Sequence, residues 1–277
     1  EGLGMKLAEA LEIVTRTDPG MVRSHNEDAV FGDAQLGLAI LADGMGGYNA
    51  GEVASGMATT LLATNFARLV PASQSQLCEV GGGQQAHRHF IEQISDANSA
   101  IYNSAQSQPQ YAGMGTTLVF AWFYDNTLSV AHVGDSRLYR LRGESFEQLT
   151  RDHSLLQEQL DSGMISVEDA RHSQNKNLVT RALGVDPSVE PEIHDYDVAP
   201  GDIFLLCSDG LNDMVEDDEM SLTLQALGSN MALAADQLVQ MANDNGGRDN
   251  VSVILVKVQG DYSVPRSWWQ KLLAWLK

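Results

Sequence analysis

An apolar run that stops at an aspartate beside glycine recurs along the chain and limits its possible folds. Residues 36–41 form a short apolar run that is typical of a buried strand, and Asp43 and Gly44 follow it closely. Glycine permits positive φ and a close approach of the backbone to whatever Asp43 holds. The pattern occurs twice more, and once in reverse order: residues 128–133 before Asp135, residues 203–207 before Asp209, and Asp249 before residues 251–258. One such aspartate is an ordinary turn residue, but four at strand ends predict a shared carboxylate site.

The charge of the chain limits its partners. Its 277 residues include 37 acidic and 17 basic side chains, which give a net charge of −20. Such a surface repels polyanions, so we expect no nucleic-acid partner. No segment of the sequence approaches the roughly 20 apolar residues that a helix needs to cross a bilayer. Two cysteines are too few for a disulfide framework. We therefore expect a cytoplasmic protein without a secretory leader.

Hydrophobic periodicity predicts helices between the strands. The segments in which apolar residues recur at every third or fourth position are residues 52–70, 90–104, 154–160 and 231–242. Residues 71–85 are rich in Ser, Gln and Gly, and we expect a loop there. Residues 152–190 are polar, include a further expected helix at 175–183, and are well placed to form a flap over a site. We expect one domain at residues 5–260 and a separate tail at 261–277.

The tail carries three of the four tryptophans of the chain. Its apolar residues recur at helical spacing, and they are Trp268, Trp269, Leu272, Leu273, Trp275 and Leu276. Arg266, Lys271 and Lys277 make the tail basic. The plainest interpretation is a helix that packs against its own domain. Docking on a partner protein is the main alternative, and contact with a membrane surface is the least favoured one.

The strand-end aspartates imply a metal site if their strands lie in adjacent sheets. The acidic residues that would then converge are Glu27, Asp28, Asp43, Asp135, Asp209 and Asp249. Carboxylates this close together raise one another's pKa unless cations compensate their charge. A set of oxygen ligands without Cys or His selects hard ions such as Mn²⁺ or Mg²⁺. Two such ions can lower the pKa of a water for attack on a phosphoester, and Arg23 could hold the phosphate bidentately.

Six short motifs occur in one fixed order between about residues 12 and 258. They are Arg23-Ser-His-Asn-Glu-Asp28, Leu41-Ala-Asp-Gly-Met-Gly-Gly47, Gly113-Met-Gly-Thr-Thr117, Val133-Gly-Asp-Ser-Arg137, Cys207-Ser-Asp-Gly210 and Arg248-Asp-Asn-Val-Ser252. In these motifs the chain resembles the metal-dependent type 2C serine/threonine protein phosphatases, in their stand-alone bacterial form. No single motif is specific, whereas the ordered set is.

The resemblance implies an α+β fold. In this fold, a four-layer αββα sandwich, two antiparallel β-sheets pack face to face, with helices on both outer faces and a helical flap at about residues 152–190. It also implies a phosphatase that hydrolyses phosphoserine and phosphothreonine by attack of a water that two metal ions bridge and activate. Such an enzyme would reverse a bacterial Ser/Thr kinase in signalling. Its partners would be phosphorylated proteins and that kinase system, and we expect a monomer.

The resemblance further assigns ligands to two core Mn²⁺ or Mg²⁺ ions and to a third ion. The implied metal ligands are Glu27, Asp43, the Gly44 carbonyl, Asp135, Asp209 and Asp249. Asp43 would bridge the two core ions. Asp209 and Asp249 would complete one core site, and Glu27 with Gly44 the other. Asp135 would hold the third ion together with Asp209.

Two further roles follow from the resemblance, and one is left without a residue. Arg23 would bind the substrate phosphate, and Asp28 would orient water at the metals. Eukaryotic members carry a histidine, the proposed general acid, where this chain has Met45. A thioether cannot donate a proton, so the proton for the leaving group must come from metal-bound water or from another group. His25 and His153 lie near motif residues in the sequence and are candidates.

Two other classes of function stay open. A catalytically inactive relative that binds phosphopeptides would need a replaced metal ligand, and every expected ligand is present. A metal-dependent nuclease or small-phosphoester hydrolase would use the same ions. The net charge of −20 argues against the nuclease.

Overall fold

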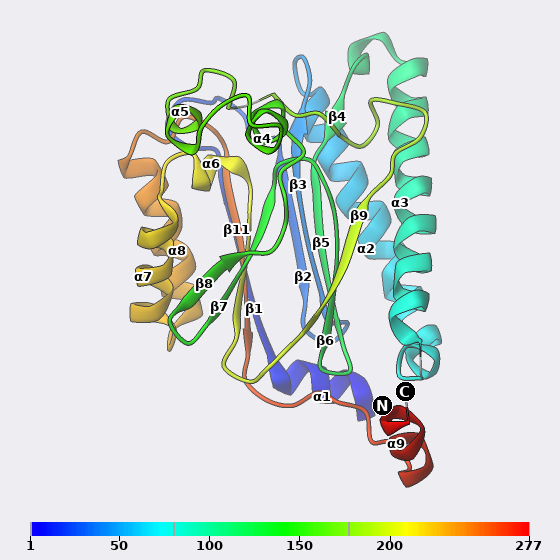
Figure 1. Ribbon diagram of the computed structural model, residues 1–277. Helices are drawn as coiled ribbons and strands as arrows, with labels where there is room; N and C mark the ends of the chain where they lie inside the picture. Colours follow the sequence, from blue (N-terminus) through cyan, green and yellow to red (C-terminus); the bar gives the residue numbers. More distant parts are fainter. Residues whose placement is uncertain (1, 80, 177, 277) are drawn as a thin grey trace.

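Two β-sheets face each other between outer layers of helices (Figure 1). The computed structural model describes residues 2–79, 81–176 and 178–276. Every strand pairing that joins neighbours within these two sheets is antiparallel in the described chain. The predicted four-layer αββα sandwich is therefore confirmed.

The first sheet contains, in spatial order, β1 (Leu11–Asp18), β11 (Val251–Val258), β10 (Ile203–Cys207), β7 (Arg137–Arg142) and β8 (Ser145–Gln148). The second contains β2 (Asp28–Asp33), β3 (Leu38–Met45), β5 (Leu118–Tyr124), β6 (Thr127–Val133) and β9 (Glu192–Asp197). The short strand β4 (Gly115–Thr116) pairs with the end of β3.

Helices cover the outer face of each sheet. Those on the second sheet are α2 (Ala50–Leu77) and α3 (Gly82–Ser107), and those on the first are α7 (Asp217–Leu227) and α8 (Met231–Asp244). The remaining helical segments are α1 (Gly2–Ala10), η1 (Pro109–Tyr111), α4 (Leu155–Asp161), α5 (Val167–Arg171), α6 (Asp209–Asn212) and α9 (Trp268–Trp275). Asp209 thus begins a helical turn immediately after β10.

The alternation of side chains along β3 explains where Asp43 points. Ala39 and Leu41 belong to the core between the two sheets, whereas Ile40 and Ala42 pack under α2 and α3. Because successive side chains of a strand point to opposite faces, Asp43 projects into the gap between the sheets. The strand reads as a continuous apolar run because both of its faces are covered.

The prediction of a loop at residues 71–85 is wrong. Helix α2 runs through Pro71 to Leu77, and α3 begins at Gly82 after a tight turn. The reason is burial, because Val70 and Leu77 pack in the core under the second sheet while the intervening Ser and Gln residues mostly face outward. The Ser-, Gln- and Gly-rich composition of this segment gave no sign of its apolar face.

The prediction of a helix at residues 175–183 is also wrong, although the helix that begins after Ser154 forms as expected. The described residues of this segment form turns and bridges, with Val179 opposite Ser154 and Leu183 opposite Thr116. The segment is therefore held by backbone hydrogen bonds to its neighbours. It closes the flap against the end of the sandwich that carries the motif residues.

The tail forms helix α9, but the helix does not pack against the domain as expected. Trp268, Trp269 and Trp275 are 63%, 60% and 82% exposed. Residues 261–264 hold the connection to the domain, and the Tyr262 side chain is buried there. In the described part of the chain, no helix is both long enough and apolar enough to cross a membrane.

Candidate active site

Strand register brings the first two carboxylates together. Asp28 begins β2 and lies directly opposite Asp43 on β3. Val30 packs between the sheets, and the side chain of Asp28, two residues earlier on the same strand, points to the same face. The carboxyl groups of Asp28 and Asp43 therefore both enter the gap between the sheets. The first sheet closes this gap from the other side with Ser208 and Ser252, which continue the inward-facing residues of β10 and β11.

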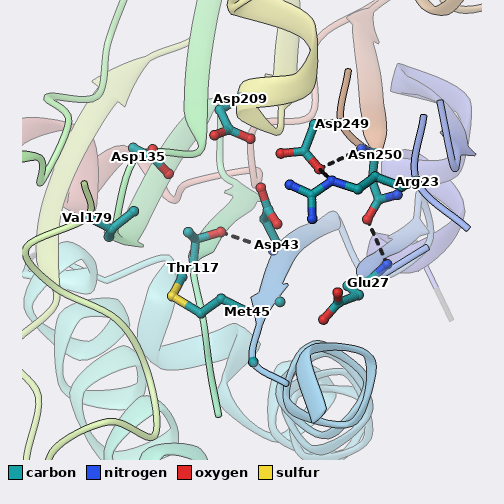
Figure 2. A pocket seen from close by; sticks show the side chains of 12 residues that line it. Arg23, Glu27, Asp43, Met45, Thr117, Asp135, Val179, Asp209, Asp249 and Asn250 are labelled. Carbon is teal, nitrogen blue, oxygen red and sulfur yellow. Dashed lines mark hydrogen bonds and ion pairs between the residues drawn. The ribbon is translucent and has the colours of Figure 1, made fainter. Parts of the chain in front are cut away.

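The other expected ligands come from loops at the same end of the sandwich. Asp135 follows Gly134, whose φ of 104° turns the chain out of β6. Asp209 is the first residue of α6, and Asp249 precedes β11. Figure 2 shows Asp135 and Asp209 on one side of a pocket, Asp249 and Arg23 on another, and Asp43 between them. The pocket has a volume of about 230 Å³.

The structure brings all the expected site residues to this one place. The expected residues that line the pocket are Arg23, Glu27, Asp43, Gly44, Asp135, Asp209 and Asp249. Asp28 lies behind them, and its carboxyl group interacts electrostatically with that of Asp43. The carboxyl groups of Asp43 and Asp209 interact in the same way. Their roles as ligands remain predictions.

Two serine hydroxyl groups hold Asp28 in place. Ser208 and Ser252 donate hydrogen bonds to its Oδ2 at 2.9 and 2.6 Å. Ser208 also accepts the backbone N–H of Ser252 at 3.0 Å, which joins the two donors. One carboxylate oxygen of Asp28 is thus fixed, and the other, Oδ1, is buried and has no hydrogen-bond partner in the described chain.

Asn250 organises the loop that carries Arg23 and Glu27, and sequence reasoning gave it no role. Its side-chain oxygen accepts the backbone N–H of Glu27 at 2.9 Å. Its amide nitrogen donates to the carbonyls of Pro19 and His25 at 3.0 and 2.7 Å. Its position beside Asp249 in a motif was the only available signal, because its three partners lie more than 200 residues away in the sequence.

Glu27 rests against the start of helix α2. A Cβ atom added to Gly51 would lie 1.6 Å from Glu27 Oε2, and one added to Gly44 would lie 1.9 Å from the Gly51 carbonyl oxygen. The Gly44 backbone N–H donates to the Glu27 carbonyl at 3.0 Å, and Ser55 Oγ donates to the same carbonyl at 2.6 Å. Gly44 therefore serves a close approach to the backbone of Gly51, whereas the sequence predicted an approach to whatever Asp43 holds. The need for glycine at position 51 was missed.

The carboxylates of the pocket are difficult to ionise together. Burial raises the pKa of Glu27 and of Asp209, and it raises the pKa of Asp28 to about 7. Burial, together with the neighbouring carboxylates, holds the pKa of Asp43 and of Asp135 well above the usual range. Ionising these carboxylates together at neutral pH costs free energy, and positive charge within the pocket would remove that cost.

The unpaired oxygens of these residues suit divalent cations. Glu27 Oε2, Asp28 Oδ1 and Asp209 Oδ1 are buried and have no hydrogen-bond partner in the part of the chain that the structure describes. Buried polar atoms without partners are rare in folded proteins unless a water or ion satisfies them. All the donors are oxygens, which Mn²⁺ and Mg²⁺ prefer. The residues present therefore fit the metal that the sequence predicts.

Arg23 is the basic residue among the described residues that line the pocket. Its Nε lies 3.5 Å from Asp249 Oδ1, and its side chain is half exposed. The guanidinium group therefore stands at the entrance with donor groups available for an anion. Two parallel N–H donors match the oxygens of a phosphate.

The two histidine candidates for the proton donor do not line the pocket. His153 accepts the backbone N–H of Gly134 at its Nδ1, at 3.1 Å, and its Nε2 lies 2.9 Å from Glu192 Oε2. Both ring nitrogens are therefore in use. His132 stacks on His153 and lies 2.8 Å from the Arg151 carbonyl oxygen. Although His132, His153 and Glu192 come close enough to surround a cation, these hydrogen bonds explain the cluster without one. Met45 does line the pocket.

Comparisons with known proteins agree with this geometry. The chain matches the family model for Protein phosphatase 2C over residues 22–252. It is 40% identical over 245 residues to the serine/threonine phosphatase stp of Listeria welshimeri serovar 6b, which covers 87% of this chain and 94% of that protein. The structure of serine/threonine phosphatase Stp1 from Staphylococcus aureus has a TM-score of 0.80 at 36% identity and covers 90% of this chain and 96% of its own. The catalytic domain of the phosphatase PstP, in complex with two manganese ions, has a TM-score of 0.78 at 37% identity and covers 91% and 99%.

Proposed function

The chain belongs to the protein phosphatase 2C family as a metal-dependent serine/threonine phosphatase of the bacterial type, and we propose that its reaction takes place in the carboxylate pocket. The observation that carries this proposal is the group of buried carboxylates with unpaired oxygens beside a single arginine. The substrates are proteins that carry phosphoserine or phosphothreonine. The enzyme acts as a monomer through one catalytic domain, and it reverses the work of a Ser/Thr kinase.

We assign the ligands as the sequence motifs imply. Asp43 would be a ligand of both core ions, because it lies in the centre of the pocket between Asp209 and Glu27 (Figure 2). Asp209 and Asp249 complete one core site, and Glu27 with the Gly44 carbonyl completes the other. Asp135 serves a third ion together with Asp209. The interaction of the Asp135 and Asp209 carboxylates supports this last assignment.

When bound, Mn²⁺ or Mg²⁺ supplies the positive charge that activates a nucleophile and stabilises the charge on a phosphoester. The protein holds the groups that bind the phosphate and orient the water in place. Arg23 binds the phosphate through its guanidinium group at the mouth of the pocket. Ser208 and Ser252 hold one oxygen of Asp28, which leaves the other available to orient water at the metals. Asn250 fixes the loop between them, so that Arg23 and Glu27 keep their relative places.

A comparison of substrates tests the proposed function. In the presence of Mn²⁺ we expect kcat/KM on a phosphothreonine peptide to exceed that on a nucleoside monophosphate by at least about tenfold, because the entrance is open to an extended chain. Single-stranded DNA should not be cleaved, since the net charge of −20 repels it. Phosphate release measured on each substrate decides the matter. No release from the peptide, with or without Mn²⁺, would contradict the proposal.

We further propose that helix α9 docks on a protein partner. Its exposed apolar side chains are Trp268, Trp269, Leu272, Leu273, Trp275 and Leu276. Aromatic residues of this kind are enriched in protein interfaces. The helix lies at the opposite end of the molecule from the flap helices α4 and α5 (Figure 1), so it does not contribute to the carboxylate pocket.

Deleting residues 265–277 is expected to leave kcat/KM on a phosphopeptide within about twofold, because the tail is remote from the pocket. It should lower kcat/KM by about fivefold or more on the autophosphorylated cognate kinase, since loss of roughly 1 kcal/mol of docking energy gives that factor. Equal rates on the kinase with and without the tail would refute this docking role. Binding of the intact chain to lipid vesicles, lost on deletion, would assign the tail to a membrane surface instead.

A further inference from the structure

A second pocket adjoins the carboxylate pocket and shares Arg23 and Asp249 with it. Its volume is about 250 Å³. Three basic residues from distant segments line it: Arg23 from the loop after β1, Lys176 from the flap, and Arg248 from the turn before β11. We call this space the rim pocket.

Unpaired cations are uncommon in this acidic protein, and two of them meet at the rim pocket. The basic residues that form ion pairs with Asp or Glu are Lys6, Arg16, Arg23, Arg137, Arg140, Arg142, Arg151, Arg171 and Arg266. The side chains of Lys176 and Arg248 form no ion pair or hydrogen bond within the described ranges, and both are exposed. Their charges are therefore available to a ligand.

The other basic side chains without a partner in the described chain lie elsewhere. Arg68, Arg88 and Lys271 are exposed on helices α2, α3 and α9, and none of them lines the rim pocket. The chain has more than twice as many acidic as basic residues, 37 against 17. The rim pocket, lined by three basic and two acidic residues, is therefore a local reversal of the charge of the protein.

Two acidic residues of the rim pocket do not cancel this charge. Asp249 pairs with Arg23 and is one of the proposed metal ligands, so its carboxylate serves the neighbouring pocket. Asp213 lies at the end of α6 and is partly buried, whereas Lys176 and Arg248 are exposed. An anion that enters from solvent therefore meets the two free cations first.

From this arrangement, and resting on the proposed function, we propose that the rim pocket binds an anionic side chain of the phosphoprotein substrate, near the residue whose phosphate enters the carboxylate pocket. The shared chemistry is a carboxylate of Asp or Glu, or a second phosphate. The two pockets share Arg23, and an extended chain advances about 3.3–3.6 Å per residue. The anionic residue should therefore lie within a few positions of the phosphoresidue. Lys176 and Arg248 are then specificity-determining residues.

A set of phosphothreonine peptides tests this proposal on the full-length protein with Mn²⁺. Each peptide carries one Glu at a single position from three residues before to three residues after the phosphothreonine, and its partner peptide carries Gln there. We expect one or two neighbouring positions at which Glu raises kcat/KM by about two- to fivefold, since an exposed ion pair contributes up to about 1 kcal/mol. The gain should shrink as salt is raised from 50 to 500 mM, because salt screens exposed charges.

Two variants assign the effect to its residues. In Lys176→Gln and in Arg248→Gln, the ratio of the Glu to the Gln peptide should fall toward one. In Arg88→Gln, which removes another exposed and unpaired cation on α3, the ratio should stay at its wild-type value. A peptide with a non-hydrolysable phosphonate analogue of phosphoserine in place of the Glu distinguishes the two sources of the anion: a larger gain assigns the pocket to a second phosphate, and an equal or smaller gain to a carboxylate.

The outcomes separate this proposal from the one on which it rests. Equal hydrolysis of all Glu and Gln peptides overturns the rim pocket and leaves the phosphatase assignment intact. A Glu preference that survives in both Lys176→Gln and Arg248→Gln also overturns it. Failure to release phosphate from any peptide overturns both proposals together.

Discussion

Asp209→Asn is expected to lower kcat/KM on a phosphothreonine peptide by about 10³-fold or more in the presence of Mn²⁺. Asp209 has an unpaired, buried Oδ1 and its carboxyl interacts with those of Asp43 and Asp135, so it stands where the proposed ions share ligands. Asparagine keeps the shape of the side chain but removes its charge. A factor of 10³ corresponds to about 4 kcal/mol of lost transition-state stabilisation, which is reasonable for damage to the ion that generates the nucleophile.

Stability measurements distinguish this loss from unfolding. Burial raises the pKa of Asp209, so its contribution to stability is present at low pH and is lost as the pH rises through its folded-state pKa. Asparagine cannot ionise. The metal-free variant should therefore melt at the same temperature as the wild type or higher at pH 8. Asp218→Asn, an exposed change on α7, serves as the control and should keep full activity. An Asp209→Asn protein within tenfold of wild-type activity would remove Asp209 from the metal site.

Gly51→Ala is expected to lower kcat/KM by about 10- to 100-fold, although alanine is the better helix former. A Cβ atom at this position would lie 1.6 Å from Glu27 Oε2 and 2.9 Å from the Gly44 carbonyl carbon. The Glu27 carboxylate must therefore move, and with it one proposed core ligand. Displacing a ligand through its supporting residues commonly reduces metal affinity or activity by this factor. The Mn²⁺ concentration at half-maximal activity should rise together with the loss of rate.

Gly56→Ala on the same helix is the matched control. Nothing lies within 4 Å of the Cβ it would add, so the change should stabilise the protein by about 0.5–1 kcal/mol through helix propensity alone. Its activity should equal that of the wild type. If Gly51→Ala retained wild-type Mn²⁺ affinity and rate, Glu27 would not need the place that the structure gives it.

The strands that are buried on both faces could be predicted from the sequence. Strands β3, β10 and β11 could be read as apolar runs because the core between the sheets and the helical layers bury both of their faces. The hairpin of α2 and α3 could not, because Pro71 and the Ser and Gln residues after it concealed a buried face at Val70 and Leu77. The segment at 175–183 has an ambiguous composition, and its bridges to Ser154 and Thr116 fixed its conformation.

The residues of the candidate site likewise include some that the sequence predicts and some that only the structure reveals. The carboxylates were identifiable because their chemistry and their place at strand ends are local properties. Asn250 and Gly51 were not, since each acts through contacts with distant segments, such as the one between Asn250 and Glu27, which lies 223 residues away. His153 looked available in the sequence, but its contacts with Gly134 and Glu192 take both ring nitrogens.

The sequence by itself predicted the residues of a hard-ion site and determined an order of motifs that identifies the family, because a side chain's chemistry and the apolar run of a buried strand need no knowledge of distant segments. Only the tertiary structure decided which carboxylates face one another, which oxygens remain unpaired, and that two free cations share a pocket beside them. Asp28 receives its hydrogen bonds from residues 180 and 224 positions away. Burial, unpaired oxygens and local charge arise from such long-range contacts, so no local pattern could have specified them.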